Sequence, residues 1–282
     1  MTGFINLYKP QGMSSALAVN IVKKKFNSPC GHMGTLDPLA EGVLPIAVGK
    51  ATRLFQYTLE KQKTYIAEFT FGAITDTLDR AGVVEKTCEK IPTEREIINA
   101  LPTLVGKIMQ VPPKYSAKNI AGKRGYELAR KGVEFSLPAK EVNILSFELL
   151  GKVSENTFRF KIECEGGTYI RSLARDLGEK VGSLAYMSSL IRSKSGIFEI
   201  ENSITIEQLK SCENIESLLT PSDSVVCFEK LVLTNETATK ILNGVYEDIG
   251  VLDGTYRVYN GEEFWGVGVA EKGKLKIKSY VR

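Results

Sequence analysis

The stretch Gly31-His32-Met33-Gly34-Thr35-Leu36-Asp37-Pro38-Leu39-Ala40-Glu41-Gly42 decides how the rest of this chain is interpreted. Its glycines and its proline exclude an uninterrupted helix or strand. Asp37 precedes a proline, which pushes its backbone away from the α-helical region, so we expect its carboxylate on an extended loop. Such a carboxylate, with the only histidine of the chain nearby, is suited to act as a nucleophile or base. The residues alone favour a plainer alternative, a turn with a solvated histidine.

Composition describes an ordinary globular protein. The 282 residues are 43% hydrophobic and 25% charged, enough for one large domain or two, and the net charge of +4 permits an anionic partner. The five cysteines form no Cys-x-x-Cys pair, and Cys30 and His32 alone are too few ligands, so we expect no metal site and no disulfide framework. Without a basic leader or an apolar run of about 18 residues, we expect a cytoplasmic protein and no membrane partner.

Apolar periodicity predicts alternating strands and helices. Ser14 or Ser15 can cap a helix, and Tyr65 lies on the apolar face of an alternating strand. Residues 218–224 have the composition of a linker, and Asn260-Gly261 predicts a hairpin turn. The remaining expected elements are strands at 4–8, 43–48, 64–71 and 196–200, helices at 51–59, 93–101, 170–181, 206–210 and 236–243, and a hairpin of 142–150 with 157–164.

Residues 112–132 interleave lysines and arginines, Lys123 and Arg124 among them, with Tyr115 and Tyr126. Basic and aromatic side chains in alternation are typical of a segment that contacts nucleic-acid phosphates. On composition alone, a solvated basic loop explains the segment equally well.

Four motifs, in this order, carry a family resemblance. Lys9-Pro10-Gln11-Gly12-Met13-Ser14-Ser15 matches KPxGxxS, residues 31–42 match GHTGTLDPxAxG, residues 63–82 match KTYxAxxxxGxxTDTxDxxG, and residues 167–178 match GTYIRxLxxDLG. The chain resembles the TruB family of tRNA pseudouridine synthases over almost its whole length.

The resemblance implies an α+β fold with a mixed, mostly antiparallel sheet flanked by helices. It implies a catalytic domain at residues 1–220, with an RNA-gripping insertion at about 112–132, and a small PUA-like β-barrel at 225–282 that binds RNA. The implied reaction isomerises the uridine at position 55, in the tRNA T loop, to pseudouridine after the base is flipped out. The partner is then the T stem-loop of tRNA, the protein is a monomer, and a rearrangement without redox change needs no cofactor.

The same resemblance assigns the site. Asp37, Tyr65 and Arg171 are the catalytic residues, with Tyr65 under the flipped uracil and Arg171 paired with Asp37. The implied substrate-binding residues are His32, Lys9, Lys50, Tyr169, Leu190, Asp79, Lys123 and Arg124. This chain departs from the family pattern at Met33, where threonine is usual, at Asn119, where the YSAxK lysine falls, and at Tyr186, where many members have histidine.

Two other functions remain to be weighed. A non-catalytic tRNA-binding or tRNA-folding protein would use the same basic surfaces, but it would not need the set Asp37, Tyr65 and Arg171. A hydrolase using Asp37 and His32 lacks a serine, cysteine or metal partner at a recognisable spacing.

Overall fold

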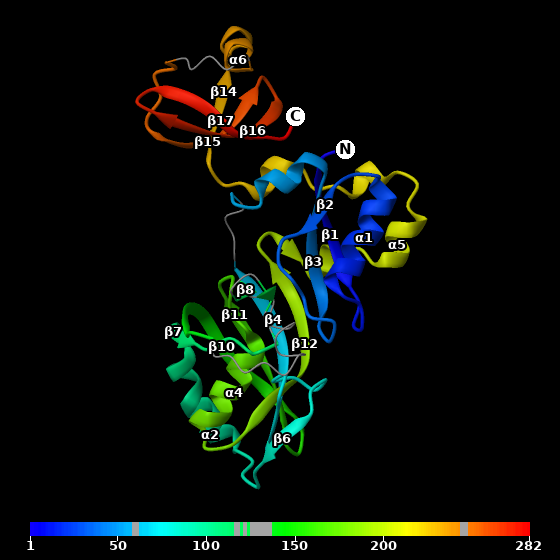
Figure 1. The fold of residues 1–282 in the computed structure, drawn as a ribbon, viewed down its shortest axis with the longest axis vertical. Helices are drawn as coiled ribbons and strands as arrows, with labels where there is room; N and C mark the ends of the chain where they lie inside the picture. Colours follow the sequence, from blue (N-terminus) through cyan, green and yellow to red (C-terminus); the bar gives the residue numbers. More distant parts are fainter. Residues whose placement is uncertain (58–61, 116–118, 121–122, 125–136, 243–247) are drawn as a thin grey trace. The chain divides into compact units, whose positions relative to one another are not determined.

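The computed structural model describes residues 1–57, 62–115, 119–120, 123–124, 137–242 and 248–282 (Figure 1). The chain forms two compact units. Unit 1 comprises Met1–Pro38, Gly42–Lys61 and Ser195–Arg282, and unit 2 comprises Leu39–Glu41 and Gln62–Lys194. Unit 1 includes residues from both sides of the boundary expected between 220 and 225, so the division into domains 1–220 and 225–282 stays a prediction.

Unit 1 begins with a small antiparallel sheet. Strand β3 (Glu41–Val48) pairs with β1 (Gly3–Lys9) and with β2 (Cys30–His32), and nearly all of its residues are buried. The other elements of unit 1 are α1 (Ser15–Phe26), η1 (Gly49–Leu54), β13 (Phe198–Glu199), η3 (Ile200–Asn202), α5 (Ile206–Ser211), η4 (Ile215–Leu218), η5 (Ser222–Val225), β14 (Glu229–Leu233), α6 (Asn235–Leu242), β15 (Gly254–Asn260), β16 (Glu263–Glu271) and β17 (Lys274–Tyr280). The helix expected at 51–59 is instead the short 3-10 turn η1, and residues 58–61 lie outside the described part.

Helix α1 begins directly after Ser14, one of the two caps that the sequence predicts. Ala18, Val22 and Phe26 recur every four residues, and all three are buried on one face. The side chain of Ser14 caps the first turn, and three lysines stand in the last turn, where the helix dipole favours positive charge. The helix packs against β2 and α5 (Figure 1).

The last part of unit 1 is a four-stranded sheet in the order β14-β15-β16-β17. The turn at Asn260-Gly261 joins β15 to β16 as predicted, and Trp265 is almost wholly buried in the core beside it. Strand β14 pairs with β15 in parallel, and β14 and β17 are the two edges. The expected barrel is therefore corrected to an open sheet in the part of the chain that the structure describes.

The expected linker at 218–224 is held in place. Phe4 and Thr220 exchange two backbone hydrogen bonds, of 2.9 and 2.7 Å. The hydroxyl of Tyr259 donates to Asp223 Oδ2 at 2.7 Å. Both backbone and side-chain bonds thus fix this segment within unit 1, and its role as the connection between two domains stays a prediction.

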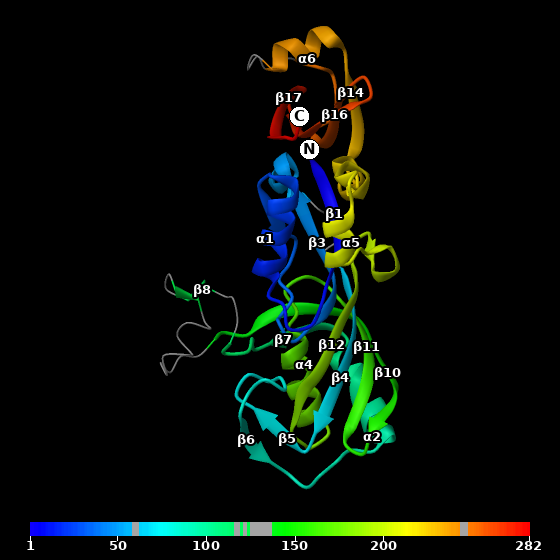
Figure 2. The same ribbon diagram turned by 90° about the vertical axis from the view of Figure 1, so that its right-hand side faces the viewer.

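Unit 2 is built on the strand order β12-β4-β11-β10-β7, in which β4 pairs antiparallel with β11, and β10 with β11 and β7 (Figure 1). Figure 2 shows the same strands after a turn of 90°. Leu173 and Leu177 of α4 are fully buried, and the helix packs against β4 and α2. The elements are β4 (Lys63–Phe71), β5 (Ala73–Thr75), β6 (Val84–Thr87), α2 (Glu94–Ala100), η2 (Leu101–Leu104), β7 (Gly106–Gln110), β8 (Asn119–Ile120), β9 (Lys123–Arg124), β10 (Lys140–Ser154), β11 (Thr157–Cys164), α4 (Ile170–Lys180) and β12 (Ala185–Ser195). The predicted fold class, a mostly antiparallel sheet flanked by helices, is confirmed.

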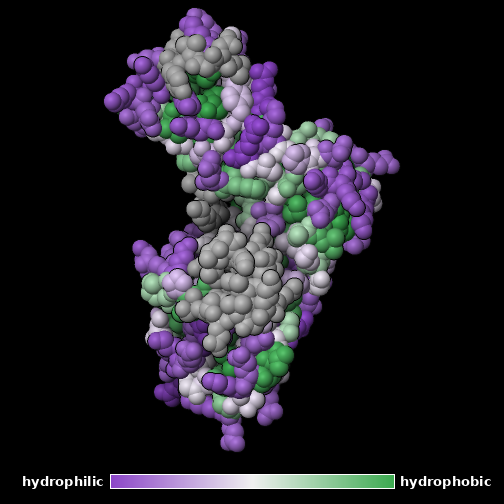
Figure 3. All heavy atoms as spheres, viewed as in Figure 1, coloured by the Kyte–Doolittle hydropathy of each residue, from purple (hydrophilic) through white to green (hydrophobic). Residues whose placement is uncertain are grey.

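The surface drawn in Figure 3 is mainly hydrophilic, with hydrophobic side chains gathered in small separate groups. Among the described residues, no helix has the length and apolar character needed to cross a membrane.

Candidate active site

The loop that carries Asp37 is anchored in the core of unit 1. Leu36 is buried directly before Asp37, which is itself partly exposed. Gly34 has a φ of 143°, a conformation that L side chains rarely adopt. The N–H of Gly12 donates to the carbonyl oxygen of Pro38 at 2.7 Å. The chain on both sides of Asp37 is thus fixed while its carboxylate can reach a ligand.

His32 ends strand β2 and lies at the start of the same loop. Its Nδ1 accepts a hydrogen bond from the N–H of Gly34 at 3.4 Å. A ring nitrogen that accepts a hydrogen bond carries no proton, so this contact favours the tautomer protonated at Nε2. Burial raises the pKa of the nearby Cys30 thiol to about 11, which keeps Cys30 protonated at neutral pH.

The other two predicted catalytic residues lie in unit 2. Tyr65 is buried on β4, and Leu190 is buried on the neighbouring strand β12. Arg171 lies in the first turn of α4 with only 7% of its surface exposed. Because Asp37 belongs to unit 1, its convergence with Tyr65 and Arg171 stays a prediction.

Arg171 is held by three groups of unit 2. Its Nη1 donates to the carbonyl oxygen of Thr77 at 3.0 Å, and its Nη2 donates to that of Tyr115 at 3.1 Å. Its Nη1 also lies 3.4 Å from Oδ2 of Asp79, and both side chains are more than nine-tenths buried. A buried guanidinium needs such partners, since an unpaired charge away from water is costly. Asp79 therefore contacts Arg171, and its place at the substrate site stays a prediction.

The loop from Thr75 to Gly82 gives Asp79 a fixed position. Oδ1 of Asp79 accepts from the Thr77 hydroxyl at 2.8 Å and from the N–H of Ala81 at 3.0 Å. Leu78 adopts a left-handed φ of 61°, and its carbonyl accepts from the N–H of Met187 on β12 at 3.1 Å. These contacts leave the second carboxylate oxygen of Asp79 directed at Arg171.

Tyr169 precedes α4, and a residue that the sequence analysis missed holds it. The side-chain amide of Gln110 accepts from the N–H of Tyr169 at 2.8 Å and donates to its carbonyl oxygen at 3.2 Å. Gln110 is only 1% exposed at the end of β7, where a strand pattern predicts an apolar side chain. A glutamine at a core position of an alternating strand was the signal in the sequence, because a buried amide requires partners.

Lys9 and Lys50, both expected to bind the phosphates of the substrate, lie in different surroundings. Lys9 is wholly buried, and its Nζ donates to the carbonyl oxygens of Pro10 at 3.0 Å and Met13 at 2.7 Å. This position argues against a phosphate contact, so we withdraw that role and assign Lys9 to the turn before α1. Lys50 is exposed, and its Nζ donates to the carbonyl oxygen of Arg282. Its phosphate contact stays a prediction.

Lys123 and Arg124 form the short strand β9, which pairs with β8. Much of the predicted gripping insertion, Tyr126 included, lies outside the described residues. The role of this insertion therefore stays a prediction.

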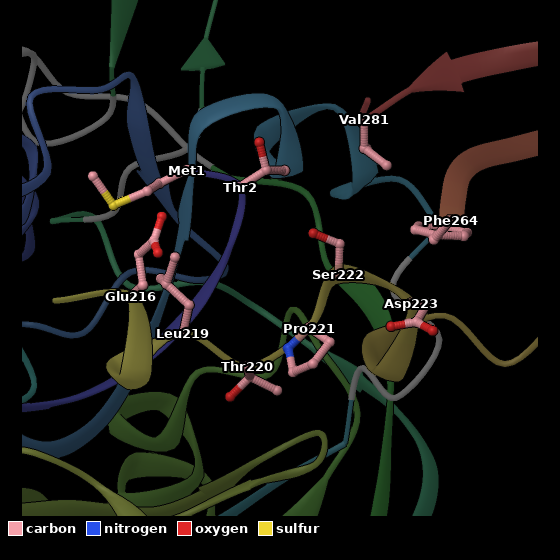
Figure 4. Close-up of a pocket in the computed structure, with 10 residues that line it drawn as sticks. All are labelled: Met1, Thr2, Glu216, Leu219, Thr220, Pro221, Ser222, Asp223, Phe264 and Val281. Carbon is pink, nitrogen blue, oxygen red and sulfur yellow. The ribbon is translucent and has the colours of Figure 1, made fainter. Parts of the chain in front are cut away.

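Two other features of the described residues do not compete with this site. Unit 1 contains a cavity of about 400 Å³ whose lining, drawn in Figure 4, includes none of the predicted site residues. The cavity is lined by Met1, Thr2, Glu216, Leu219, Thr220, Pro221, Ser222, Asp223, Phe264 and Val281. Within the described ranges, no group of three or more histidine, cysteine, aspartate or glutamate residues could hold a metal ion.

Comparison with known families identifies the kind of protein that carries this loop. Residues 22–170, more than half of the chain, match the model of the TruB family pseudouridylate synthase N-terminal domain. The chain belongs to the TruB family. Residues 171–227 match a second model, the tRNA pseudouridylate synthase B C-terminal domain. The resemblance drawn from the motifs is thus confirmed.

Curated TruB relatives match over most or all of their length. A tRNA pseudouridine synthase B from Clostridium tetani is 41% identical over 98% of this chain and 98% of its own. Another from Alkaliphilus oremlandii is 39% identical over 95% of this chain and 93% of its own. One from Anaplasma marginale is 46% identical over 77% of this chain and 71% of its own.

Solved structures agree on the fold of this TruB chain. A Cbf5–Nop10–Gar1 complex matches with a TM-score of 0.69 and 27% identity over 98% of this chain and 79% of that chain. An H/ACA RNP bound to a substrate RNA containing 2′-deoxyuridine matches with a TM-score of 0.71 and 24% identity, over 99% of this chain and 85% of that chain. The latter likeness concerns the fold alone.

One departure from the TruB motif has a structural explanation. Met33 stands where the family usually has threonine, and its side chain packs against the buried cluster that includes Phe4, Val43 and Ala47. Apolar packing thus occupies the position of a hydroxyl. Asn119 lies in β8 and Tyr186 in β12, and nothing in the structure explains these two departures.

Proposed function

We propose that this protein converts the uridine at position 55, in the T loop of tRNA, into pseudouridine, and that it acts as a monomer in the cytoplasm. Three observations support the proposal. The chain belongs to the TruB family of pseudouridylate synthases. Its full-length relatives are named tRNA pseudouridine synthase B. Asp37, the residue that the family motif makes catalytic, lies partly exposed on an anchored loop. That aspartate loop is the observation on which the mechanism depends.

The reaction is a rearrangement in which every atom is accounted for. The bond from ribose C1′ to uracil N1 breaks, a bond from C1′ to C5 forms, and the hydrogen of C5 leaves as a proton while N1 gains one. Uracil stays in the pocket, so no separate leaving group has to be released. An aspartate can attack C1′ through an oxocarbenium-like state, assist elimination at C2′, or add to C6 of uracil. These three routes make the same demand on Asp37, an ionised and positioned carboxylate.

The surrounding residues supply position and charge. Arg171, held by Asp79 and Thr77, would stabilise the ionised carboxylate of Asp37 by charge attraction if the two pair. An aromatic ring such as Tyr65 can stack on uracil, which is worth about 1–3 kcal/mol.

The base must first leave the T loop, at a cost of a few kcal/mol. We assign His32 to the space that the base vacates. Phosphate contacts from Lys50 and from the insertion at 112–132 would compensate for that cost.

The proposal is tested with tRNA whose uridines carry tritium at C5. Each conversion replaces the C5 hydrogen by C1′, so tritium appears in water in proportion to the pseudouridine formed. We expect one tritium per tRNA, and none from a matched tRNA with cytidine at position 55. Binding without release on a competent tRNA would contradict the proposal and favour a tRNA-folding protein. Free uracil in solution would indicate a glycosidase instead.

A further inference from the structure

Two adjacent serines at the start of α1 have separate roles. Ser14 is exposed, and its Oγ accepts a hydrogen bond from the N–H of Leu17 at 3.1 Å, which caps the helix. Ser15 is only 4% exposed, and its side chain bonds outside the helix. The helix cap is therefore complete without Ser15, and another reason is needed for a buried hydroxyl here.

The hydroxyl of Ser15 binds both backbone groups of Leu36. Its Oγ donates to the carbonyl oxygen of Leu36 at 2.7 Å and accepts from the N–H of Leu36 at 2.9 Å. Leu36 is 3% exposed, so water has little access to replace these bonds. Leu36 immediately precedes Asp37, and Pro38 on the other side is bound by the N–H of Gly12 at 2.7 Å. Ser15, at the start of α1, and Gly12, in the turn before it, thus bind the chain one residue before and one residue after Asp37.

We infer that Ser15 is a positioning residue that holds the Asp37 loop in its reactive place. The inference rests on the proposed function, since it assigns Ser15 a share in that reaction. A reaction in which a carboxylate must closely approach a carbon or a proton slows by about 100-fold when the carboxylate is displaced by about 1 Å. Leu36 and Pro38 flank Asp37 directly, so the hydrogen bonds to their backbone groups help to fix the position of the aspartate. Ser15 supplies two of these bonds with one hydroxyl.

The neighbouring serine provides a matched control. Ser15→Ala removes the grip on Leu36, and Ser14→Ala removes the helix cap while it leaves Leu36 bound. For Ser15→Ala we expect the single-turnover rate of pseudouridine formation at saturating protein to fall about 10- to 100-fold. Its affinity for tRNA should stay within about twofold of wild type, because the RNA-binding surfaces are untouched. Ser14→Ala should keep both the rate and the affinity.

A second measurement tests the contact itself. Amide hydrogen exchange of Leu36 should accelerate in Ser15→Ala and stay protected in Ser14→Ala, because only the first variant loses the acceptor. If Ser15→Ala does not fold, the isosteric Ser15→Cys takes its place, since a thiol is a weaker hydrogen-bond donor and acceptor. Ser15→Thr, which restores a hydroxyl, should then recover most of the rate.

The outcomes separate this inference from the proposed function. A Ser15→Ala protein with the rate of Ser14→Ala, or with Leu36 still protected, would overturn the positioning role. Wild-type protein that releases no tritium would overturn the proposed function. In that case, exchange of the Leu36 amide that accelerates in Ser15→Ala but not in Ser14→Ala would still support the hydrogen bonds from Ser15 to the loop. Unchanged exchange in Ser15→Ala would refute them.

Discussion

Replacing Asp79 by asparagine removes one charge from a buried ion pair and changes little else. The amide oxygen can keep the two hydrogen bonds that Oδ1 accepts from Thr77 and Ala81. The amide nitrogen then faces Nη1 of Arg171 at the 3.4 Å now occupied by an oxygen, so that two donors oppose each other. At an effective dielectric constant of about 20, two unit charges at this distance attract by about 5 kcal/mol.

The net loss of stability is smaller than this attraction, because burying the two charges costs desolvation free energy that offsets part of it. Removing one partner of a buried pair costs about 3–5 kcal/mol, and Arg171 keeps the carbonyl oxygens of Thr77 and Tyr115. We expect Asp79→Asn to lower the free energy of unfolding by about 2–4 kcal/mol, as measured by urea denaturation. Pseudouridine formation should fall about 10- to 100-fold, because Arg171 loses a fixed position.

Asp76 in the same loop offers the control. It accepts one hydrogen bond, from the N–H of Val83 at 2.8 Å, which an asparagine oxygen can also accept. Asp76→Asn should therefore lie within about 1 kcal/mol of wild type and keep its rate. Equal losses of stability and rate in the two variants would refute the role assigned to the pair of Asp79 and Arg171.

Three further predictions concern other contacts. A backbone hydrogen bond from Thr93 and then the Lys90 ammonium lower the pKa of Glu96 from 4.5 to about 2. Glu96→Gln should thus be less stable than wild type at neutral pH, and the difference in the free energy of unfolding should vanish as pH falls from 4.5 to about 2. Denaturation measured across this pH range checks the prediction, and a difference that persists at low pH would contradict it. Gln110→Met removes two hydrogen bonds to the backbone of Tyr169, the residue before α4, so we expect a loss of about 1–3 kcal/mol in thermal denaturation, and a neutral result would show that these bonds contribute nothing. Charge reversal at Lys123 and Arg124 should weaken tRNA binding and flatten its log–log salt dependence by about 0.7–0.9 per lost phosphate contact, and an unchanged slope would show that the insertion does not touch the backbone.

Most of the fold could be predicted, because its signals are local. The alternation around Tyr65, the capping box at Thr93 and Glu96 and the turn at Asn260-Gly261 each depend on a few neighbouring residues, and each is present. The open C-terminal sheet and the bound segment at 218–224 could not be predicted in this way. Both depend on which strands and segments pair at long range, and the pairing of Phe4 with Thr220 joins residues far apart in the chain.

The same difference between local and long-range signals applies to the candidate site. The motif predicted an extended loop for Asp37, whereas the ion pair of Asp79 with Arg171 joins residues far apart in the chain and was not predicted. The resemblance assigned Lys9 to substrate binding, and here two carbonyl oxygens accept hydrogen bonds from its ammonium in a fully buried side chain. Ser14 and Ser15 were equivalent helix caps by sequence; which hydroxyl caps and which binds the loop is decided by the burial of Ser15 against Leu36.

The most direct test of the account is the chemistry of Asp37→Asn in a single turnover. Asparagine keeps the size and shape of the side chain but removes the nucleophilic charge. The variant should bind T-arm RNA with an affinity within about threefold of wild type, since the residues proposed to contact phosphates lie elsewhere in the chain. With saturating variant protein and C5-tritiated tRNA, we predict no release of tritium under conditions in which wild type releases one per tRNA. Tritium released by Asp37→Asn at the wild-type rate would show that another residue carries out the reaction.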